Sequence, residues 1–160
     1  MGADAYWYYV PYEEDINNAL QKLKKREFEA GRYRPVMYTG DLAFPMDDIS
    51  KAPAPGKEHE TIEEAIEDAM EDGTGSILDL EKISEDEYYS VAYILKKEEL
   101  TKYFNTEKPT REIINENIDK FWDDVSELMG VRGVGVCTIV YKNETPSELF
   151  FMGYSWDLKN

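Results

Sequence analysis

The sequence VGVCTIVYKNETPSELFFMGYSW, residues 134–156, decides the fold because it contains two strand patterns separated by a turn pattern. Residues 134–141 and 148–156 are rich in aromatic and β-branched side chains, which favour strands. Residues 142–147 contain Asn, Pro and Ser, which are typical of turns. In 148–156 one alternating set of positions is aromatic throughout and the other is also largely apolar, which is typical of a core strand. The segment therefore predicts a C-terminal β-hairpin in the core of the sheet.

The N-terminal part predicts a strand followed by a helix. Residues 5–12 are aromatic and β-branched up to Pro11, and they predict a strand that ends there. From Glu13 onward the apolar residues recur with helical spacing, and Gly31 is suited to the position just after the helix end. Glu27 falls inside the apolar arc, so we expect the last turn of this helix to bend or fray.

Two further helices are marked by their first residues. Thr61 and Glu64 form the pattern of a capping box, and the apolar arc behind them predicts a helix to about Asp72. Thr110 has the position of an N-cap for a helix that runs to about Met129. In the helix predicted to end at about Asp72, all acidic residues lie on the side opposite the apolar arc.

The remaining elements are short. We expect strands at 36–38, 42–44, 76–80 and 88–95, an acidic turn at 84–87, and a helix at 97–104. Four strands or more with helices between some of them predict an α+β fold, with an antiparallel or mixed sheet of about 4–6 strands and helices packed on it. The 160 residues indicate one domain, with a long irregular Pro-containing loop near 45–60.

The net charge of −16 is the clearest feature of the composition. It argues against nucleic acid and against anionic membranes as partners, since both are bound by Lys and Arg. It favours either solubility alone or a basic protein partner. A single cysteine, Cys137, excludes an internal disulfide, and the first residues lack a secretion signal, so we expect a cytoplasmic protein. The oligomeric state is left open.

Catalytic and metal chemistry lack their usual residues. His59 is the one histidine, and Cys137 lies in a predicted strand, where a free cysteine usually packs as a small apolar residue. One Cys and one His cannot build a zinc cluster, and the stretch closest to a calcium-binding loop has Met70 at a ligand position. We therefore expect no metal and no cofactor, and we favour a protein that is not an enzyme.

Charge is distributed unevenly along the chain. Residues 22–34 carry six basic residues against two acids, whereas residues 58–87 carry thirteen acids against Lys82 alone. A solvated surface would explain this distribution. The alternative is a docking face for a basic partner, because like charges on one rigid face increase association rates. The residues predicted to contact that partner are Glu63, Glu67, Asp68, Glu71, Glu85, Asp86 and Glu87.

A non-enzymatic binding module of the immunity-protein or inhibitor kind is therefore the leading hypothesis. The alternative is an enzyme or small-ligand-binding protein that uses carboxylates, Tyr and Arg around the 45–60 loop. Its candidate ligand-binding residues are Arg32, Arg34, His59 and Arg132. A concave pocket lined by Tyr and Arg would favour this alternative.

Four segments carry a resemblance to a known family. They are the phrases Tyr6–Trp7–Tyr8 with Pro11–Tyr12, residues 26–33 (REFEAGRY), residues 72–79 (DGTGSILD) and residues 150–157 (FFMGYSWD). Together they resemble an uncharacterised family of small bacterial proteins. The resemblance covers most of the chain and implies no activity.

Overall fold

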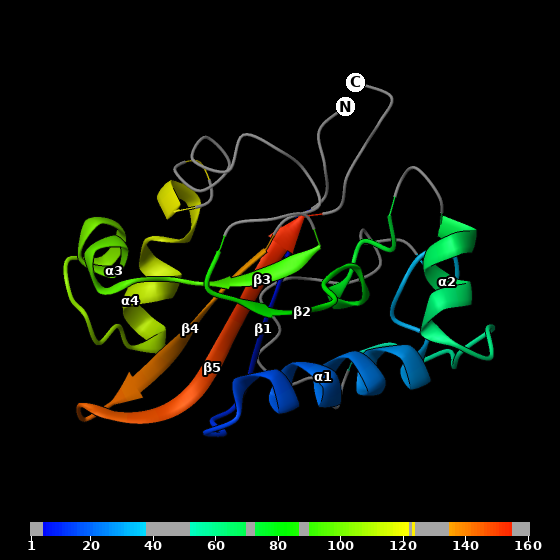
Figure 1. The fold of residues 1–160 in the computed structure, drawn as a ribbon, viewed down its shortest axis with the longest axis horizontal. Helices are drawn as coiled ribbons and strands as arrows, with labels where there is room; N and C mark the ends of the chain where they lie inside the picture. Colours follow the sequence, from blue (N-terminus) through cyan, green and yellow to red (C-terminus); the bar gives the residue numbers. More distant parts are fainter. Residues whose placement is uncertain are drawn as a thin grey trace.

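The computed structural model describes residues 5–37, 52–69, 73–86, 90–121, 123 and 135–154. Five strands form one mixed sheet in the order β1-β5-β4-β3-β2 (Figure 1). Their bounds are β1 Ala5–Pro11, β2 Lys82–Ser84, β3 Val91–Ile94, β4 Gly135–Lys142 and β5 Thr145–Tyr154. The fold is α+β, as the sequence predicts.

The C-terminal hairpin forms the antiparallel half of the sheet. β5 lies between β4 and β1 and is antiparallel to both. The turn is shorter than predicted, because only Asn143 and Glu144 lie outside the strands. Both residues have positive φ, 52° and 63°, which matches the two-residue turn that suits the twist of a hairpin. The predicted central position of this hairpin is confirmed.

The other half of the sheet is parallel and departs from the predicted boundaries. β2 pairs parallel with β3, and β3 pairs parallel with β4. β2 occupies residues 82–84, so it includes the first residue of the predicted acidic turn. β3 is shorter than the predicted strand 88–95, since Ser90 has a φ of 60° and precedes the extended residues.

The predicted strand at 76–80 is wrong. Residues Ile77–Asp79 form a short 3₁₀ helix, η4, with Ser76 as its N-cap. The Oγ of Ser76 accepts a hydrogen bond from the backbone N–H of Leu78, at 3.3 Å. The carboxylate of Asp79 accepts two more from Thr74, one from its backbone N–H at 2.9 Å and one from its hydroxyl at 2.8 Å. These local side-chain bonds curl the segment, because they offer its backbone partners that a strand ladder would otherwise supply. The described residues 36 and 37 also lie in a turn rather than a strand, and the predicted strand at 42–44 lies outside the described residues.

The first helix, α1, spans Ile16–Ala30 and keeps its last turn. The expected bend at Glu27 is wrong, because this carboxylate is fully buried and paired with Arg32. Gly31 ends the helix with a φ of 76°, and its N–H bonds to carbonyl oxygens of the last turn. A Cβ at Gly31 would collide with the backbone of Gly56, so glycine also permits the close approach of the 52–60 segment.

The remaining helices are short. α2 spans Ile62–Ala69, α3 spans Lys97–Phe104 and α4 spans Arg111–Glu116. Residues 70–72, where the second helix was predicted to end, and 124–129, where the last was, lie outside the described residues. The long helix predicted after Thr110 is interrupted at Asn117, whose side-chain amide donates to the Ile113 carbonyl at 2.8 Å. Helical structure resumes at 118 after this turn.

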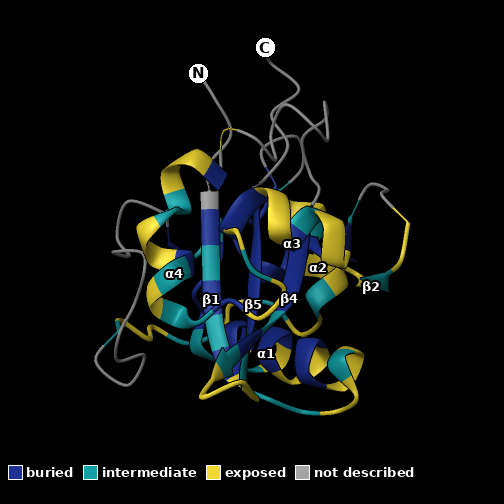
Figure 2. Cartoon of the chain, turned by 90° about the vertical axis from the view of Figure 1, so that its left-hand side faces the viewer, coloured by how far each residue is buried: buried dark blue, intermediate teal, exposed yellow. Residues whose placement is uncertain are grey.

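Two hydrophobic clusters lie on opposite sides of the sheet. α1, α2 and η4 contribute to the first cluster, on the side reached by Tyr6, Tyr8 and Phe151. We call this side the α1 face. α3 and α4 contribute to the second, on the side reached by Phe150 and Met152, and we call it the α3/α4 face. Figure 2 shows the central strands buried and the outward sides of the helices exposed. The sheet is therefore covered on both faces, which explains why β5 has no polar face.

Candidate functional site

The acidic residues of α2 belong to a longer exposed segment. Residues 58–68 contain six acids and no Lys or Arg, and we call this stretch the acidic segment. Glu58, Glu60, Glu63, Glu64, Glu67 and Asp68 are all exposed. The segment begins α2 with the predicted cap, because the N–H of Glu64 donates to the Thr61 hydroxyl at 3.2 Å. The Glu64 carboxylate in turn accepts from the N–H of Glu60, at 3.3 Å.

His59 holds the acidic segment to the rest of the molecule. Its Nε2 lies 2.9 Å from a carboxylate oxygen of Asp68, and its Nδ1 lies 2.8 Å from the Tyr33 hydroxyl. A carboxylate can only accept, so Nε2 carries a proton, and in the neutral ring Nδ1 then accepts from the Tyr33 O–H. The Tyr33 oxygen also accepts the backbone N–H of Glu58, at 3.2 Å. We call Tyr33, His59 and Asp68 the histidine clamp.

Both ring nitrogens of His59 are engaged in the histidine clamp, one with Tyr33 and one with Asp68. Tyr33 is 2% exposed, whereas the Asp68 carboxylate stays exposed to solvent. Cys137 is buried in β4, and burial raises the pKa of its thiol from 9.0 to about 12. A thiol with such a pKa stays protonated at neutral pH and is a poor nucleophile. His59 is therefore engaged in hydrogen bonds and Cys137 in packing.

Part of the acidic segment faces a cation inside the molecule. Lys24 of α1 is 7% exposed, and burial lowers the pKa of its ammonium. The negative charges of Glu63, Glu81 and Asp79 act in the opposite direction and favour the protonated form. One cation of the basic stretch 22–34 thus lies within electrostatic range of three acids of the acidic stretch 58–87. This interaction explains some of the uneven charge distribution without a partner.

The predicted acidic residues do not all come together. Glu85 and Asp86 follow the end of β2 and line a hollow with Lys96 and Lys97, which precede and begin α3. α2 packs on η4, before β2 begins, and Figure 1 shows it apart from the tip of β2. Glu71 and Glu87 lie outside the described residues. The structure therefore unites Glu63, Glu67 and Asp68, and separates them from the turn at 85–86.

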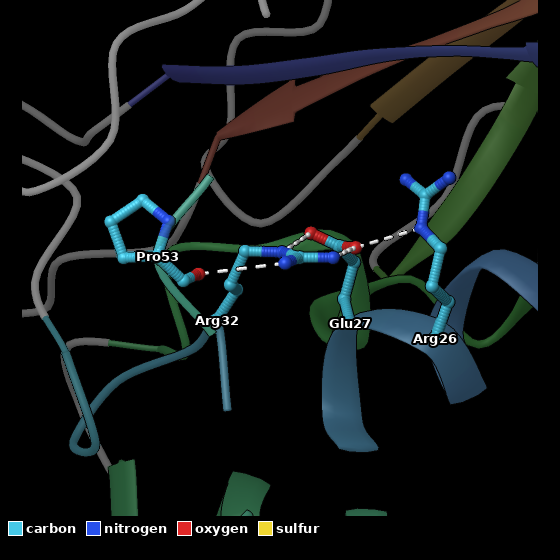
Figure 3. A network of polar contacts seen from close by, with 4 residues as sticks. All are labelled: Arg26, Glu27, Arg32 and Pro53. Atoms are coloured by element: carbon cyan, nitrogen blue, oxygen red, sulfur yellow. Dashed lines mark hydrogen bonds and ion pairs between the residues drawn. The ribbon is translucent and has the colours of Figure 1, made fainter. Parts of the chain in front are cut away.

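Arg32, Arg34 and His59, the described residues among those named for the alternative ligand site, are occupied by contacts within the protein. Arg32 donates from Nε and Nη2 to the two carboxylate oxygens of Glu27, at 2.9 and 2.8 Å (Figure 3). These hydrogen bonds raise the pKa of Arg32. Arg26 donates to the same carboxylate at 2.9 Å, and a longer bond of 3.4 Å joins Arg32 to the Pro53 carbonyl. This bidentate pair is buried, so it holds the end of α1 and the 52–60 segment together.

Arg34 donates from Nε to the carbonyl of Gly73, at 3.3 Å, and its backbone N–H bonds to Thr74. Arg132 lies outside the described residues. Within the described ranges, no group of three or more His, Cys, Asp or Glu side chains is placed to hold a metal ion. In the same part of the chain, no helix has the length and apolar character needed to cross a membrane.

A pocket with both Arg and Tyr is present, but at a different place from the one predicted. It lies between the start of α4 and the end of the hairpin, and Arg111, Tyr141 and Lys142 contribute to its walls. The sequence marks only Thr110, as the helix N-cap, and this prediction is confirmed by its 3.2 Å bond from the Ile113 N–H. No sequence pattern marks Arg111, because its neighbours in the pocket come from strands that are far from it in the sequence.

Comparisons with known proteins give no relative. No family model matches the chain, and neither the curated proteins nor the solved structures yield a match. The resemblance to a small bacterial family therefore stays a prediction.

Proposed function

We propose that this protein is a non-enzymatic binding module, of the immunity-protein or inhibitor kind, whose acidic segment contacts a basic protein partner. The observation that carries the proposal is the exposure of six acids within residues 58–68, a stretch that contains no Lys or Arg. In the ion pairs among described residues, only Asp68 of these six takes part, with His59. The carboxylates of Glu58, Glu60 and Glu67 form no hydrogen bond or ion pair with the described residues, and they are available to cations of a partner.

The acidic segment is also held in one conformation before any partner arrives. The histidine clamp joins it to the end of α1, and the N–H of Gly56 bonds to the Ala30 carbonyl at 2.9 Å. Lys57 approaches Glu29 at 3.6 Å, which adds a contact just before the segment. A surface that is already ordered loses less conformational entropy on binding, so its charges contribute more to affinity.

The arrangement has a small cost to folding that a partner would offset. Within α2, Glu63 and Glu67, and likewise Glu64 and Asp68, are four residues apart. Like charges at this spacing destabilise a helix by a few tenths of a kcal/mol for each pair. Clustered negative charge in turn steers basic proteins and raises association rates, most strongly at low ionic strength.

The proposal includes a cytoplasmic location and excludes nucleic acid as a partner. The single cysteine is buried and reduced in β4, which suits a reducing compartment. Nucleic acids are bound by clustered Lys and Arg. The basic residues of the stretch 22–34 that could have formed such a cluster include Lys24, which is buried, and Arg32, which is paired with Glu27.

The test compares two charge reversals of equal size. One variant, Glu60→Lys with Glu67→Lys, changes two exposed side chains of the acidic segment for which the structure shows no side-chain contact. The matched control, Glu107→Lys with Glu116→Lys, changes two exposed acids on the other side of the molecule. Both variants change the net charge of −16 by the same four units, since each reversal contributes two.

Each variant and the wild-type chain are used to capture proteins from a lysate of the source organism at two salt concentrations. We expect a basic protein to be recovered by the wild-type chain and by the control, and to be lost with the acidic-segment variant. Equal loss with both variants would mean that net charge alone is responsible. Equal recovery with both would mean that the acidic segment is only a solvated surface.

A further inference from the structure

A hollow lies where the start of α4 meets the end of the β4–β5 hairpin. Its volume is about 630 Å³, within the range of small-molecule sites. Thr110 and Arg111 line it from the helix, Tyr141 and Lys142 from β4, and Ser147 and Glu148 from β5. A backbone bond of 2.9 Å from the Tyr141 N–H to the Pro109 carbonyl joins the helix start to the strand. The two walls of the hollow are therefore fixed to each other.

Arg111 is held in this hollow by contacts that leave the terminal nitrogens of its guanidinium exposed. Its guanidinium carbon lies 4.2 Å from the centre of the Tyr9 ring, which is a stacking distance. The Tyr9 hydroxyl donates to the side-chain oxygen of Asn115 at 2.6 Å, so the ring that carries the guanidinium is itself fixed. The Nε of Arg111 lies 3.5 Å from a carboxylate oxygen of Glu148.

No hydrogen bond to the Arg111 guanidinium is formed by any described residue, and its buried Nε also has none. The side chain is 33% exposed, so its terminal nitrogens reach solvent. A guanidinium presents its donors as a planar fork that matches the two oxygens of a carboxylate. Stacking on Tyr9 and the nearby Glu148 orient this fork before a ligand binds.

Other groups in the hollow add donors and set its charge. The Thr110 oxygen accepts from the Ile113 N–H, which leaves its O–H to donate. Arg111 and Lys142 are balanced by Glu112 and Glu148, so the formal charge of the lining is zero in a chain of −16. Any anion held by Arg111 lies near the Glu148 carboxylate, and the repulsion between them grows with the charge of the ligand, so a singly charged carboxylate is repelled less than a doubly charged phosphate.

We infer that this hollow binds a small organic acid through one carboxylate, which the Arg111 fork holds while the Tyr141 ring supplies an apolar wall. This inference is independent of the acidic segment. It assigns a small-ligand site to a part of the chain that the sequence did not indicate.

The test uses benzoate as the probe, with benzamide as its neutral counterpart and inorganic phosphate as the competing anion. Amide chemical shifts of the wild-type chain are followed by NMR during titration with each. We expect saturable shifts at residues 110–112, 141–143 and 147–148 with benzoate, and no saturation there with benzamide. Tighter binding of phosphate than of benzoate at the same residues would overturn the assignment to a carboxylate.

Two substitutions of Arg111 distinguish the contribution of its planar guanidinium from that of its positive charge. Arg111→Gln should weaken benzoate binding at least tenfold, and Arg111→Lys should weaken it nearly as much, because lysine keeps the charge and loses the planar fork. Lys108→Gln is the matched control: Lys108 lies 6.0 Å over the Tyr141 ring but does not line the hollow, and its loss should change affinity less than twofold. The unligated NMR spectrum of each variant shows whether it folds. Wild-type affinity in a folded Arg111→Lys chain would refute the role of the fork.

Discussion

The α1 face of the sheet buries charged side chains beside its apolar cluster, whereas the buried cluster of the α3/α4 face consists of rings and aliphatic chains. On the α1 face, Glu27 is 0% exposed, Arg32 6% and Asp79 3%. On the α3/α4 face, the buried cluster consists of Tyr93, Leu95, Leu100, Tyr103, Phe104, Ile114, Phe121, Val136, Val140, Phe150 and Met152. The same sheet is thus covered in two chemically different ways.

Because of this difference, we expect substitutions on the two faces to change the stability of the protein in different ways. A buried ion pair gains little net stability, because desolvation offsets its attraction, but loss of one partner leaves an uncompensated charge. An apolar cluster loses stability in proportion to the atoms removed and the cavity left. The acidic segment is attached to the α1 face, where hydrogen bonds and ion pairs fix the positions of the buried charged residues. The proposed function therefore depends on the geometry of the α1 face.

The largest expected effect is at Glu27. Replacement by alanine leaves Arg32 buried without its carboxylate, and we expect a loss of about 4 kcal/mol in the free energy of unfolding. Urea unfolding followed by circular dichroism measures this change. Glu27 also accepts from Arg26, but that arginine is 37% exposed and can be hydrated after the substitution.

Removal of both charges is the control for this prediction. The double variant Glu27→Leu with Arg32→Met should unfold within about 2 kcal/mol of the wild-type chain, because no buried charge remains unpaired. If the double variant is as unstable as Glu27→Ala, or more so, the pair itself stabilises the fold and the comparison of the two faces fails.

The α3/α4 face should show a graded response. Ile114 of α4 is 0% exposed, and its replacement by valine should cost about 1 kcal/mol and by alanine about 3 kcal/mol. The same urea experiment measures both. If alanine lowers the free energy of unfolding no more than valine does, this cluster is loosely packed. The expected contrast between the two faces would then be wrong.

A smaller effect than those of Glu27→Ala and Ile114→Ala is a pH dependence that comes from Cys137. Burial raises the pKa of its thiol from 9.0 to about 12, so the unfolded chain ionises first as the pH rises. The stability that this thiol contributes is complete below pH 9 and is lost as the pH approaches 12. Between pH 8 and 10.5 the wild-type chain should lose about 2 kcal/mol more than Cys137→Ala.

Tyrosines do not obscure this measurement. Burial also raises the pKa of Tyr6 and Tyr8 above the ordinary value, but both variants contain these residues, and their effect cancels in the difference. Parallel stability curves for the wild-type chain and Cys137→Ala would contradict the buried, protonated thiol.

The elements predicted correctly from the sequence are those in which local pattern and tertiary packing agree. The hairpin, α1 and α3 combine strong periodicity with suitable end residues. The strand predicted at 76–80 failed because Ser76 and Asp79 bond to their own neighbours, and β2 was missed because three residues carry too little pattern. Asn117 interrupts a helix whose apolar stripe continues past it, and only the bond from its side chain to Ile113 reveals why.

Sites depend on contacts between distant segments, which a single sequence does not show. The sequence places Glu27 correctly in an apolar arc, but it does not show that Arg32 is its partner, and Arg32 is therefore predicted to bind a ligand instead. His59 and Asp68 were assigned to two different sites, and the structure joins them in one clamp with Tyr33. Arg111 and Tyr9 are more than a hundred residues apart, so no spacing rule could pair them.

The central claim is that the exposed charge of the acidic segment serves recognition, and the association rate tests it most directly. The basic protein recovered by the wild-type chain is purified, and its association with each variant is measured over a series of salt concentrations. For the wild-type chain and the Glu107→Lys/Glu116→Lys control, we expect a fast rate that falls steeply with salt. For Glu60→Lys/Glu67→Lys, we expect a slow rate with a weak salt dependence, and a free energy of unfolding within about 0.5 kcal/mol of the wild-type value. Identical rates and salt dependences for the two variants would contradict the claim.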